Sequence, residues 1–167
     1  KLEGFEPKKF GKKHTFGGFI PLRPVEKTWG EKFVLVGDSA GLCDPVTYEG
    51  ISNALKSGSI AANAIEAYLD KGHPLSLYED MWKKELYEDI NYAQKLQNLM
   101  YGHALSDKLA DAVITMAASN KDVNTALRWL LNRKESRKTV YSMLMKNKFV
   151  LLRKLGLSTV RLLPRLI

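Results

Sequence analysis

Apolar and polar positions divide the chain into an irregular first part and a helical remainder. Four consecutive apolar residues, Phe33 to Val36, precede Gly37, and so short a wholly apolar run predicts a strand buried on both faces. After Gly50, spacings of three and four predict a helix that ends near Asp70, with Gly72 as its left-handed cap. The apolar face expected for this helix is Ile51, Ala54, Leu55, Gly58, Ala61, Ala62 and Ile65.

A long amphipathic helix is expected to begin at Ser76, with Glu79 completing a capping box and Leu75 as a hydrophobic staple. Three shorter helices should follow, beginning at Ser106, beginning near Asn120, and covering residues 140–145. Aromatic residues recur along the long helix and could line a lipid tunnel, although ordinary core packing is the favoured interpretation. The expected apolar side of the long helix is Tyr78, Met81, Trp82, Leu86, Ile90, Ala93, Leu96 and Met100, and the further aromatics are Tyr87, Tyr92 and Tyr101.

The residues before Phe33 read as a connector. Residues 1–13 hold five lysines, and residues 15–20 form a glycine-interrupted apolar stretch. Such a stretch is typical of a strand that passes near a ligand, or equally of a twisted edge strand. Residues 28–32 are then expected to turn into the strand at Phe33.

Two positions flanking the predicted strand and helix have a chemistry that suits a ligand. Asp38 follows the carboxyl end of the strand, where open α/β sheets bind ligands, and its carboxylate can accept hydrogen bonds from hydroxyl groups. Gly50 lets a ligand approach the backbone closely, and the first N–H groups of a helix have no partner within it. The helix dipole adds a preference for a ligand that carries or develops negative charge.

These residues resemble the second flavin-binding motif of FAD-dependent oxidoreductases of the geranylgeranyl reductase family, within the para-hydroxybenzoate hydroxylase-like superfamily. The resemblance implies that Asp38 bonds a ribityl hydroxyl of FAD. It also implies that the helix N-terminus at Gly50 and Ile51 points at the pyrimidine edge of the flavin and the nearby phosphates. The cofactor-binding residues it implies are Gly37, Asp38, Ser39, Ala40, Gly41, Pro45, Gly50 and Ile51, and the motif continues through Ala54 and Ser57-Gly58.

One position departs from the family pattern, because Tyr48 occupies the place of the first glycine in Pro-x-x-Gly-x-Gly. Its ring is expected to border the flavin or the substrate. Cys43 lies in the same loop, where a redox or substrate-contact role competes with that of a small loop residue. Gly17 and Gly18 are expected near the cofactor, which completes the candidate substrate-lining set. An ordinary strand-turn-helix corner with a capping aspartate is the alternative to the flavin interpretation.

The predicted fold class is α/β to α+β, in which the end of a Rossmann-like FAD-binding sheet precedes a mostly helical C-terminal region. The predicted divisions are a connector and strand at 1–32, the C-terminal part of the FAD-binding domain at 33–72, and the helical region at 73–167. A flavoprotein of this family should also carry an earlier βαβ unit with Gly-x-Gly-x-x-Gly, which this sequence lacks. We therefore expect the chain to be the C-terminal part of a longer protein.

Composition and charge constrain the remaining classes. An apolar fraction of 45% and a charged fraction of 26% are those of a folded domain, and a single cysteine permits no intrachain disulfide, which favours a reducing, cytoplasmic setting. The net charge of +8 is concentrated in residues 128–167, which hold 11 basic residues and one acidic residue. This leucine-rich basic segment predicts peripheral contact with the inner face of a membrane, or packing on its own domain. Nucleic-acid binding is unfavoured, since no known nucleic-acid module is present.

By resemblance, the parent protein is an oxidoreductase that saturates geranylgeranyl double bonds in lipids or in pigment and quinone tails. A prenyl lipid would be the substrate, and NAD(P)H or a ferredoxin-like protein would supply electrons. No residue carries the signature of a catalytic acid, and the three histidines are too far apart in sequence to suggest a metal site. The alternatives are an electron-transfer flavoprotein, a FAD monooxygenase, and a cofactor-free basic helical docking module for membranes or nucleic acid.

Overall fold

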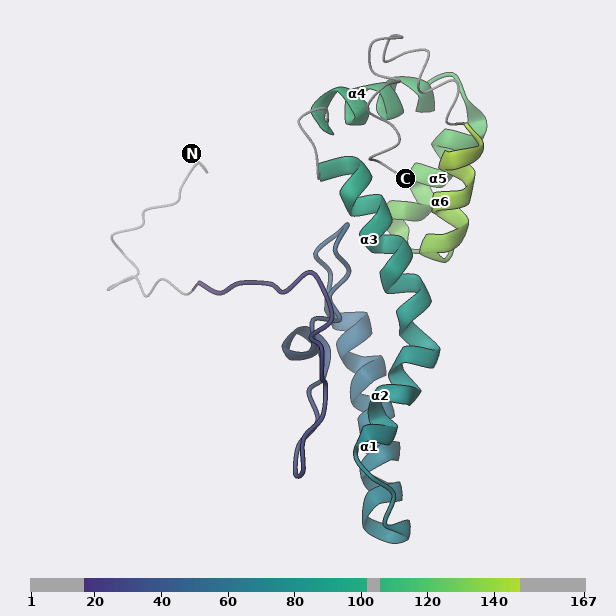
Figure 1. Ribbon diagram of the computed structural model, residues 1–167. Coiled ribbons are helices and arrows are strands. Elements are labelled where there is room, and N and C mark those ends of the chain that lie inside the picture. Colours follow the sequence, from purple (N-terminus) through teal and green to yellow (C-terminus); the bar gives the residue numbers. More distant parts are fainter. Residues whose placement is uncertain (1–16, 102–105, 148–167) are drawn as a thin grey trace, which may run out of the picture.

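The computed structural model describes residues 17–101 and 106–147, and helices dominate both ranges. Figure 1 shows an elongated arrangement in which α1 and α2 lie at one end and the long α3 leads to α4, α5 and α6 at the other. The prediction of a mostly helical region after residue 73 is confirmed for the described residues. The divisions predicted at residues 32 and 72 stay predictions, and the segment from 148 to 167 lies outside the described residues.

The strand predicted at Phe33 to Val36 is wrong for the structure as described. One isolated antiparallel bridge, between Trp29 and Val34, is the only strand-like pairing in residues 17–101 and 106–147. Phe33 is 56% exposed, and the next three residues are half-buried rather than enclosed on both faces. A strand needs a neighbouring strand to pair with, and the bridge offers a single residue pair. The predicted FAD-binding sheet is therefore not seen in this part of the chain.

Helix α1 (Ile51–Lys71) ends as predicted, at Gly72 with φ 69° and an amide that donates to the carbonyl of Tyr68. Its predicted apolar face is wrong, however. Ile51 and Leu55 are 73% and 72% exposed. The buried side instead consists of Asn53, Ser57, Ile60, Ala61 and Ala64, so only Ala61 of the predicted face is buried.

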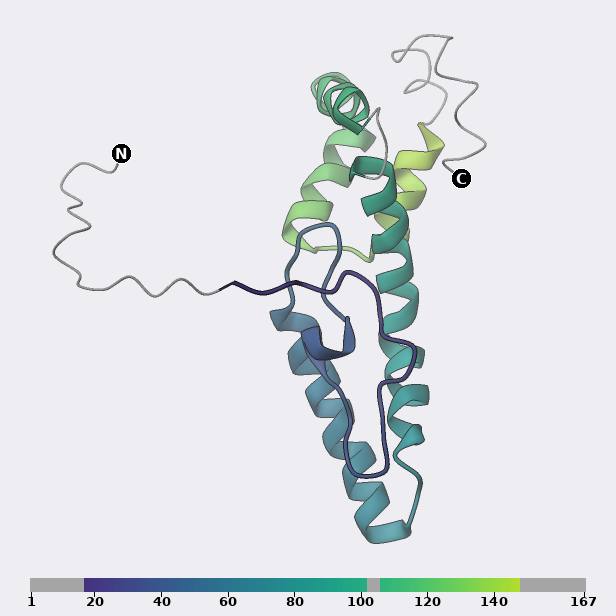
Figure 2. The same cartoon turned by 60° about the vertical axis from the view of Figure 1, so that its left-hand side comes forward.

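Helix α2 (Ser76–Trp82), the π-helical segment η3 (Lys83–Tyr87) and α3 (Glu88–Tyr101) follow one another without a break. In Figure 2 this long helix runs beside α1, with residues 17–50 lying along both. Six residues of the predicted apolar side are buried, while Met81 and Met100 are half-buried. Tyr78 and Trp82 are core residues, whereas Tyr87 and Tyr101 are exposed, which favours core packing over a continuous aromatic tunnel.

The capping box predicted at Ser76 does not form, because no side chain caps α2. The Glu79 carboxylate instead accepts hydrogen bonds from the amide and the hydroxyl of Thr28, at 3.0 and 3.1 Å, and pairs with Lys83. Burial acts to raise the pKa of Glu79, but the hydrogen bonds from Lys83 and Thr28 outweigh it and lower that pKa. The long helix thus uses Glu79 to hold the irregular segment rather than its own first turn.

The far end of the molecule contains α4 (Ser106–Ala117), α5 (Lys121–Asn132) and α6 (Arg137–Lys146). Asn120 caps α5 as the sequence predicts, by accepting hydrogen bonds from the amides of Asp122 and Val123. Helix α6 begins three residues before its predicted start because Ser136 caps it. These helices and α3 enclose one apolar core, and α1, α2 and η3 enclose a second with Ala40 and Leu42.

Candidate functional site

The segment that carries the flavin-like motif forms a 3-10 turn, η2 (Gly37–Ala40), followed by Gly41 in the left-handed conformation with φ 69°. Gly37 also has positive φ, and its amide donates to the Ser57 hydroxyl of α1 at 2.9 Å. A Cβ at Gly41 would lie 2.0 Å from the carbonyl oxygen of Arg23. Glycine is therefore required at 41 both by backbone conformation and by close packing.

Asp38 and Gly50 lie against each other, although eleven residues of loop separate them. A Cβ added to Gly50 would lie 2.4 Å from Oδ1 of Asp38, so no other residue fits at 50 without displacing the carboxylate. Asp38 is exposed, and its carboxylate is thus available to a ligand at the N-terminus of α1. The structure therefore brings together the two residues on which the flavin prediction depends most.

The N-terminus of α1 is only partly capped. Gly50 provides no side-chain cap, and Oε1 of Glu49 accepts the amide of Ser52 at 2.9 Å. Among the described residues, no acceptor meets the Ile51 amide. The hydrogen bond from the Ser52 amide, with a further one from Arg133, lowers the pKa of Glu49, which is therefore a carboxylate at neutral pH.

Tyr48 adopts the backbone conformation that glycine would have at this position, with φ 57°. Its amide donates to the carbonyl of Asp44 at 2.8 Å, and the amide of Asp44 donates to the carbonyl of Glu49 at 2.9 Å. The tyrosine side chain is about half exposed. The left-handed position of this loop thus accepts tyrosine, and the departure from the pattern puts a half-exposed aromatic side chain next in sequence to Glu49.

Cys43 lies beneath the same loop and is buried. Burial, reinforced by the carboxylates of Asp38, Asp44 and Glu49, raises the pKa of its thiol to about 11. A thiol with that pKa is protonated at neutral pH and is a poor nucleophile. The geometry favours the small loop residue over a redox role.

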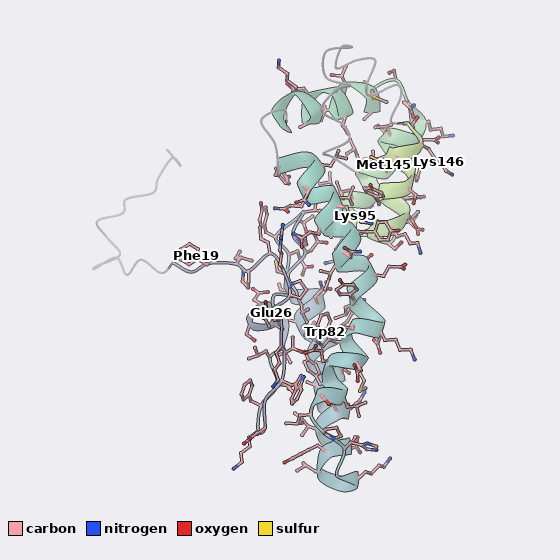
Figure 3. The ribbon with its side chains drawn as sticks, in the orientation of Figure 1. Phe19, Glu26, Trp82, Lys95, Met145 and Lys146 are labelled. Carbon is pink, nitrogen blue, oxygen red and sulfur yellow. The ribbon has the colours of Figure 1, made fainter. Side chains whose placement is uncertain are left out.

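The remaining predicted site residues divide between the loop and the surface. Ala40, Gly41 and Pro45 are buried beneath the site, and the hydroxyl of Ser39 donates to the carbonyl of Val36. Gly17 and Gly18 do not join them, since a Cβ at either would meet no atom within 4 Å. Figure 3 shows Phe19, the next residue, on the segment that leads away from the helices. The described structure therefore gives no support to Gly17 and Gly18 as lining residues.

A separate groove of about 450 Å³ lies between residues 23–26 and the stretch from Trp82 to Asn98. Glu26 and Trp82, labelled in Figure 3, mark its two walls. Arg23, Lys83 and Asn91 are among its polar lining residues, whereas Asp38 and Gly50 are not. It is therefore distinct from the site at the α1 N-terminus.

Sequence reasoning missed Asn53, Arg133 and Arg137, and it gave Ser57 only as a position of the motif, without its contact. Ser57 and Asn53 hold the amide of Gly37 and the carbonyl of Leu42, the latter at 2.7 Å, and both break the apolar period of α1. Arg133 and Arg137 reach the loop from the turn between α5 and α6. Periodicity offers no signal for such contacts, and the basic cluster around the two arginines had suggested an external partner instead.

Two negative findings concern the described residues alone. Residues 17–101 and 106–147 contain no group of three or more histidine, cysteine, aspartate or glutamate side chains that could hold a metal ion. None of the helices described is long and apolar enough to span a bilayer.

Comparison with known proteins finds relatives that share one name. The chain is 33% identical over 113 residues to digeranylgeranylglycerophospholipid reductase 2 of Methanothermobacter thermautotrophicus, a match that covers 65% of this chain and 29% of the relative. It is 29% identical over 130 residues to the protein of the same name from Methanopyrus kandleri, covering 72% and 33%. A digeranylgeranylglycerophospholipid reductase of Methanothrix thermoacetophila is 31% identical over 123 residues, covering 69% and 31%.

The matched part spans about three tenths of the length of these relatives. No protein-family model matches the chain, and no solved structure matches it. The names of the relatives confirm the family resemblance that the residues from Gly37 to Gly58 had indicated.

Proposed function

We propose that this chain, which belongs to the geranylgeranyl reductase family, forms part of a FAD site. It would contact the ribityl chain and the flavin ring. The enzyme would saturate geranylgeranyl double bonds of prenyl lipids. The observation that carries the proposal is the contact of Asp38 with Gly50 at the start of α1. An exposed carboxylate and a glycine backbone lie together there, beside a helical amide that has no acceptor among the described residues.

The residues present fit a flavin better than a phosphate. Asp38 can accept hydrogen bonds from ribityl hydroxyls, which are donors. Glu49 already places a second negative charge at the N-terminus of α1, and two carboxylates disfavour a phosphate at that point. A neutral acceptor, such as a carbonyl on the pyrimidine edge of the flavin, suits the Ile51 amide. We therefore assign this end of α1 to the flavin ring rather than to the pyrophosphate.

The chemistry that bound, reduced FAD supplies is hydride delivery to an isolated double bond. The residues of this chain would hold and polarise the cofactor. Asp38 would orient the ribityl chain, and the Ile51 amide would donate a hydrogen bond to a carbonyl of the ring. The exposed ring of Tyr48 would border the flavin or the prenyl chain. We assign no proton donor to this segment, because Asp38 is committed to the cofactor and Cys43 is a buried thiol.

The substrate class, the electron donor and the membrane contact are part of the same proposal. A prenyl lipid is the substrate, and NAD(P)H or a ferredoxin-like protein reduces the flavin. In the described part of residues 128–167, Arg128, Lys134 and Lys146 are exposed basic residues. Arg133 and Arg137 instead pair with acidic residues of the site loop, and Lys138 pairs with Glu88. Peripheral contact with an anionic membrane would therefore use the first three.

Flavin content tests the proposal. The full-length protein should release about one FAD per chain when it is denatured, and Asp38→Ala should weaken FAD binding about tenfold to a hundredfold, since hydrogen bonds to charged groups contribute about 1.5–3 kcal/mol. Asp70→Ala, the same change at the exposed far end of α1, is the matched control and should bind FAD normally. A colourless protein that takes up no added FAD would contradict the proposal and favour a cofactor-free docking module.

Turnover separates the reductase from its flavoprotein alternatives. Anaerobic incubation with a chemical reductant and a geranylgeranyl lipid should saturate double bonds, with the product followed by mass spectrometry. A reaction that requires oxygen would indicate a monooxygenase, and a flavin that reduces a protein partner but no lipid would indicate an electron-transfer role.

A further inference from the structure

We infer that Arg133 and Arg137, at the turn between α5 and α6, are positioning residues for the loop that carries the candidate flavin site. Because we take the ligand of this loop to be FAD, their role in binding rests on the proposed function. The contacts themselves do not depend on it.

The loop from Asp44 to Gly50 is organised around one carboxylate. Oδ1 of Asp44 accepts the amides of Val46 and Thr47, at 2.9 and 3.1 Å. The backbone of Asp44 also accepts the amide of Tyr48 and donates to the carbonyl of Glu49. The side chain and peptide groups of Asp44 thus define the turn that places Gly50 beside Asp38.

Arg137 holds that carboxylate from the opposite side. Its Nε and Nη2 lie 2.8 and 2.7 Å from Oδ2 of Asp44, and the two side chains are 1% and 2% exposed. Nη1 donates to the carbonyl of Leu130 at 2.7 Å, and the backbone amide donates to Asp89 of α3 at 2.6 Å. A buried pair of this kind has its geometry set by both partners, since either charge alone would be strongly disfavoured.

Arg133 makes the second connection, to the residue that caps α1. It has the left-handed backbone conformation, with φ 51°, and its Nη1 lies 2.5 Å from Oε2 of Glu49. The other oxygen of Glu49 accepts the amide of Ser52 in the first turn of α1. Arg133 therefore orients the carboxylate that lies next to Gly50 and the Ile51 amide, for which the described residues supply no acceptor.

The two arginines connect the site to helices that are distant in sequence. The hydrogen bonds to Arg137 and Arg133 span 93 and 84 residues, respectively. Planar guanidinium groups suit this task because they present several donors in a fixed geometry, which lysine does not. A change at the α5–α6 turn should consequently alter the site without touching the cofactor.

The test uses the full-length, FAD-loaded protein with Arg133→Gln, Arg133→Lys and Arg137→Lys. Lys138→Gln is the matched control. Lys138 follows Arg137 on α6, and its exposed ion pair with Glu88 of α3, 2.7 Å long, does not involve the loop. Three quantities are measured: the Kd of FAD, the visible absorption spectrum of the bound flavin, and the hydrogen–deuterium exchange of residues 44–55 in the FAD-free protein.

Arg133→Gln should weaken FAD binding about tenfold, alter the flavin spectrum and speed exchange in residues 44–55, as expected when a charged hydrogen bond that orders a site is lost. Arg133→Lys should recover part of each change, and Lys138→Gln should alter none. Arg137→Lys should act in the same direction as Arg133→Gln, and Arg133 alone still decides the matter should that variant fail to fold.

The positioning role is overturned if the arginine variants match Lys138→Gln in Kd, spectrum and exchange, or if they lower only the melting temperature. A wild-type protein without flavin would contradict the proposed function alone. Faster exchange of residues 44–55 in Arg133→Gln would then still support the positioning of the loop, and unchanged exchange would refute it.

Discussion

The two ends of the molecule differ in the kind of residue that their helices bury. Around α3 to α6, apolar residues at helical spacing face inward, among them Leu96, Val123 and Leu130 as the pattern predicts. Leu131, which the same pattern places in the core, is 77% exposed. Around α1, the polar Asn53 and Ser57 are buried, while Ile51, Leu55 and Leu69 are largely exposed.

The difference has a physical cause. Helices that pack on helices have no backbone groups to satisfy at their interface, so apolar area decides which side faces inward. Helix α1 packs on an irregular loop, whose peptide groups need partners once they are buried. Asn53 supplies a donor to Leu42, and Ser57 supplies an acceptor to Gly37. Hydrogen bonding therefore sets the orientation of α1.

Removing apolar volume should have its largest effect at the α3–α6 end. Leu96→Ala should lower the free energy of unfolding by about 2–5 kcal/mol, because Leu96 is fully buried and a cavity would remain. Leu131→Ala, at a position 77% exposed in the same region, should change it by less than about 0.5 kcal/mol. Chemical denaturation of both variants is the measurement, and equal effects would contradict the burial described for this end.

At the α1 end, a substitution that improves the apolar pattern should destabilise the fold. Asn53→Leu should cost about 1–3 kcal/mol, because the buried carbonyl of Leu42 would lose its donor. Asn63→Leu makes the same exchange at an exposed position of α1 and should be nearly neutral. Urea unfolding measures both variants. If Asn53→Leu stabilised the fold, apolar area would decide which side of α1 faces inward, as it does at the other end.

These contrasts mark how far sequence reasoning reaches. The C-terminal end of α1 and the start of α5 follow from local signals, Gly72 and Asn120, whose hydrogen bonds are made within one turn. The motif alone indicated Asp38 and Gly50 as site residues, although not their direct contact. The rotated face of α1, the diversion of Glu79 to Thr28 and the arginine contacts could not be predicted, because each depends on a partner at least eleven residues away.

A smaller effect is expected where the loop departs from the family pattern. Tyr48→Gly should raise stability by up to about 1 kcal/mol, since relief of the left-handed conformation exceeds the entropy that glycine gains in the unfolded chain. Tyr68→Gly, inside α1, should instead be destabilising by about 1 kcal/mol. Thermal melting of the pair would contradict the assigned backbone strain if both variants lost stability equally.

The reactivity of Cys43 reports on the loop at the α1 end with the least perturbation. With its pKa raised to about 11, its thiolate fraction should increase about tenfold per pH unit between pH 8 and 10. The rate at which Cys43 reacts with a thiol reagent should follow this fraction. In the unfolded chain the reaction rate should level off above about pH 8.5. A thiol reagent followed by absorbance measures both rates, with Cys43→Ser as the blank. A plateau near pH 8.5 in the folded protein would show that the loop is open to solvent.

The bond from Asp44 to Arg137 also has a consequence for synthesis on the ribosome. A nascent chain that has emerged only as far as α3 contains every residue of the flavin motif but lacks the guanidinium that neutralises Asp44. That carboxylate must stay hydrated until the α5–α6 turn emerges, because an unpaired charge is not buried. Binding of the proposed FAD would therefore follow synthesis of the α5–α6 turn, and a product that stops short of residue 137 should fail to order the loop.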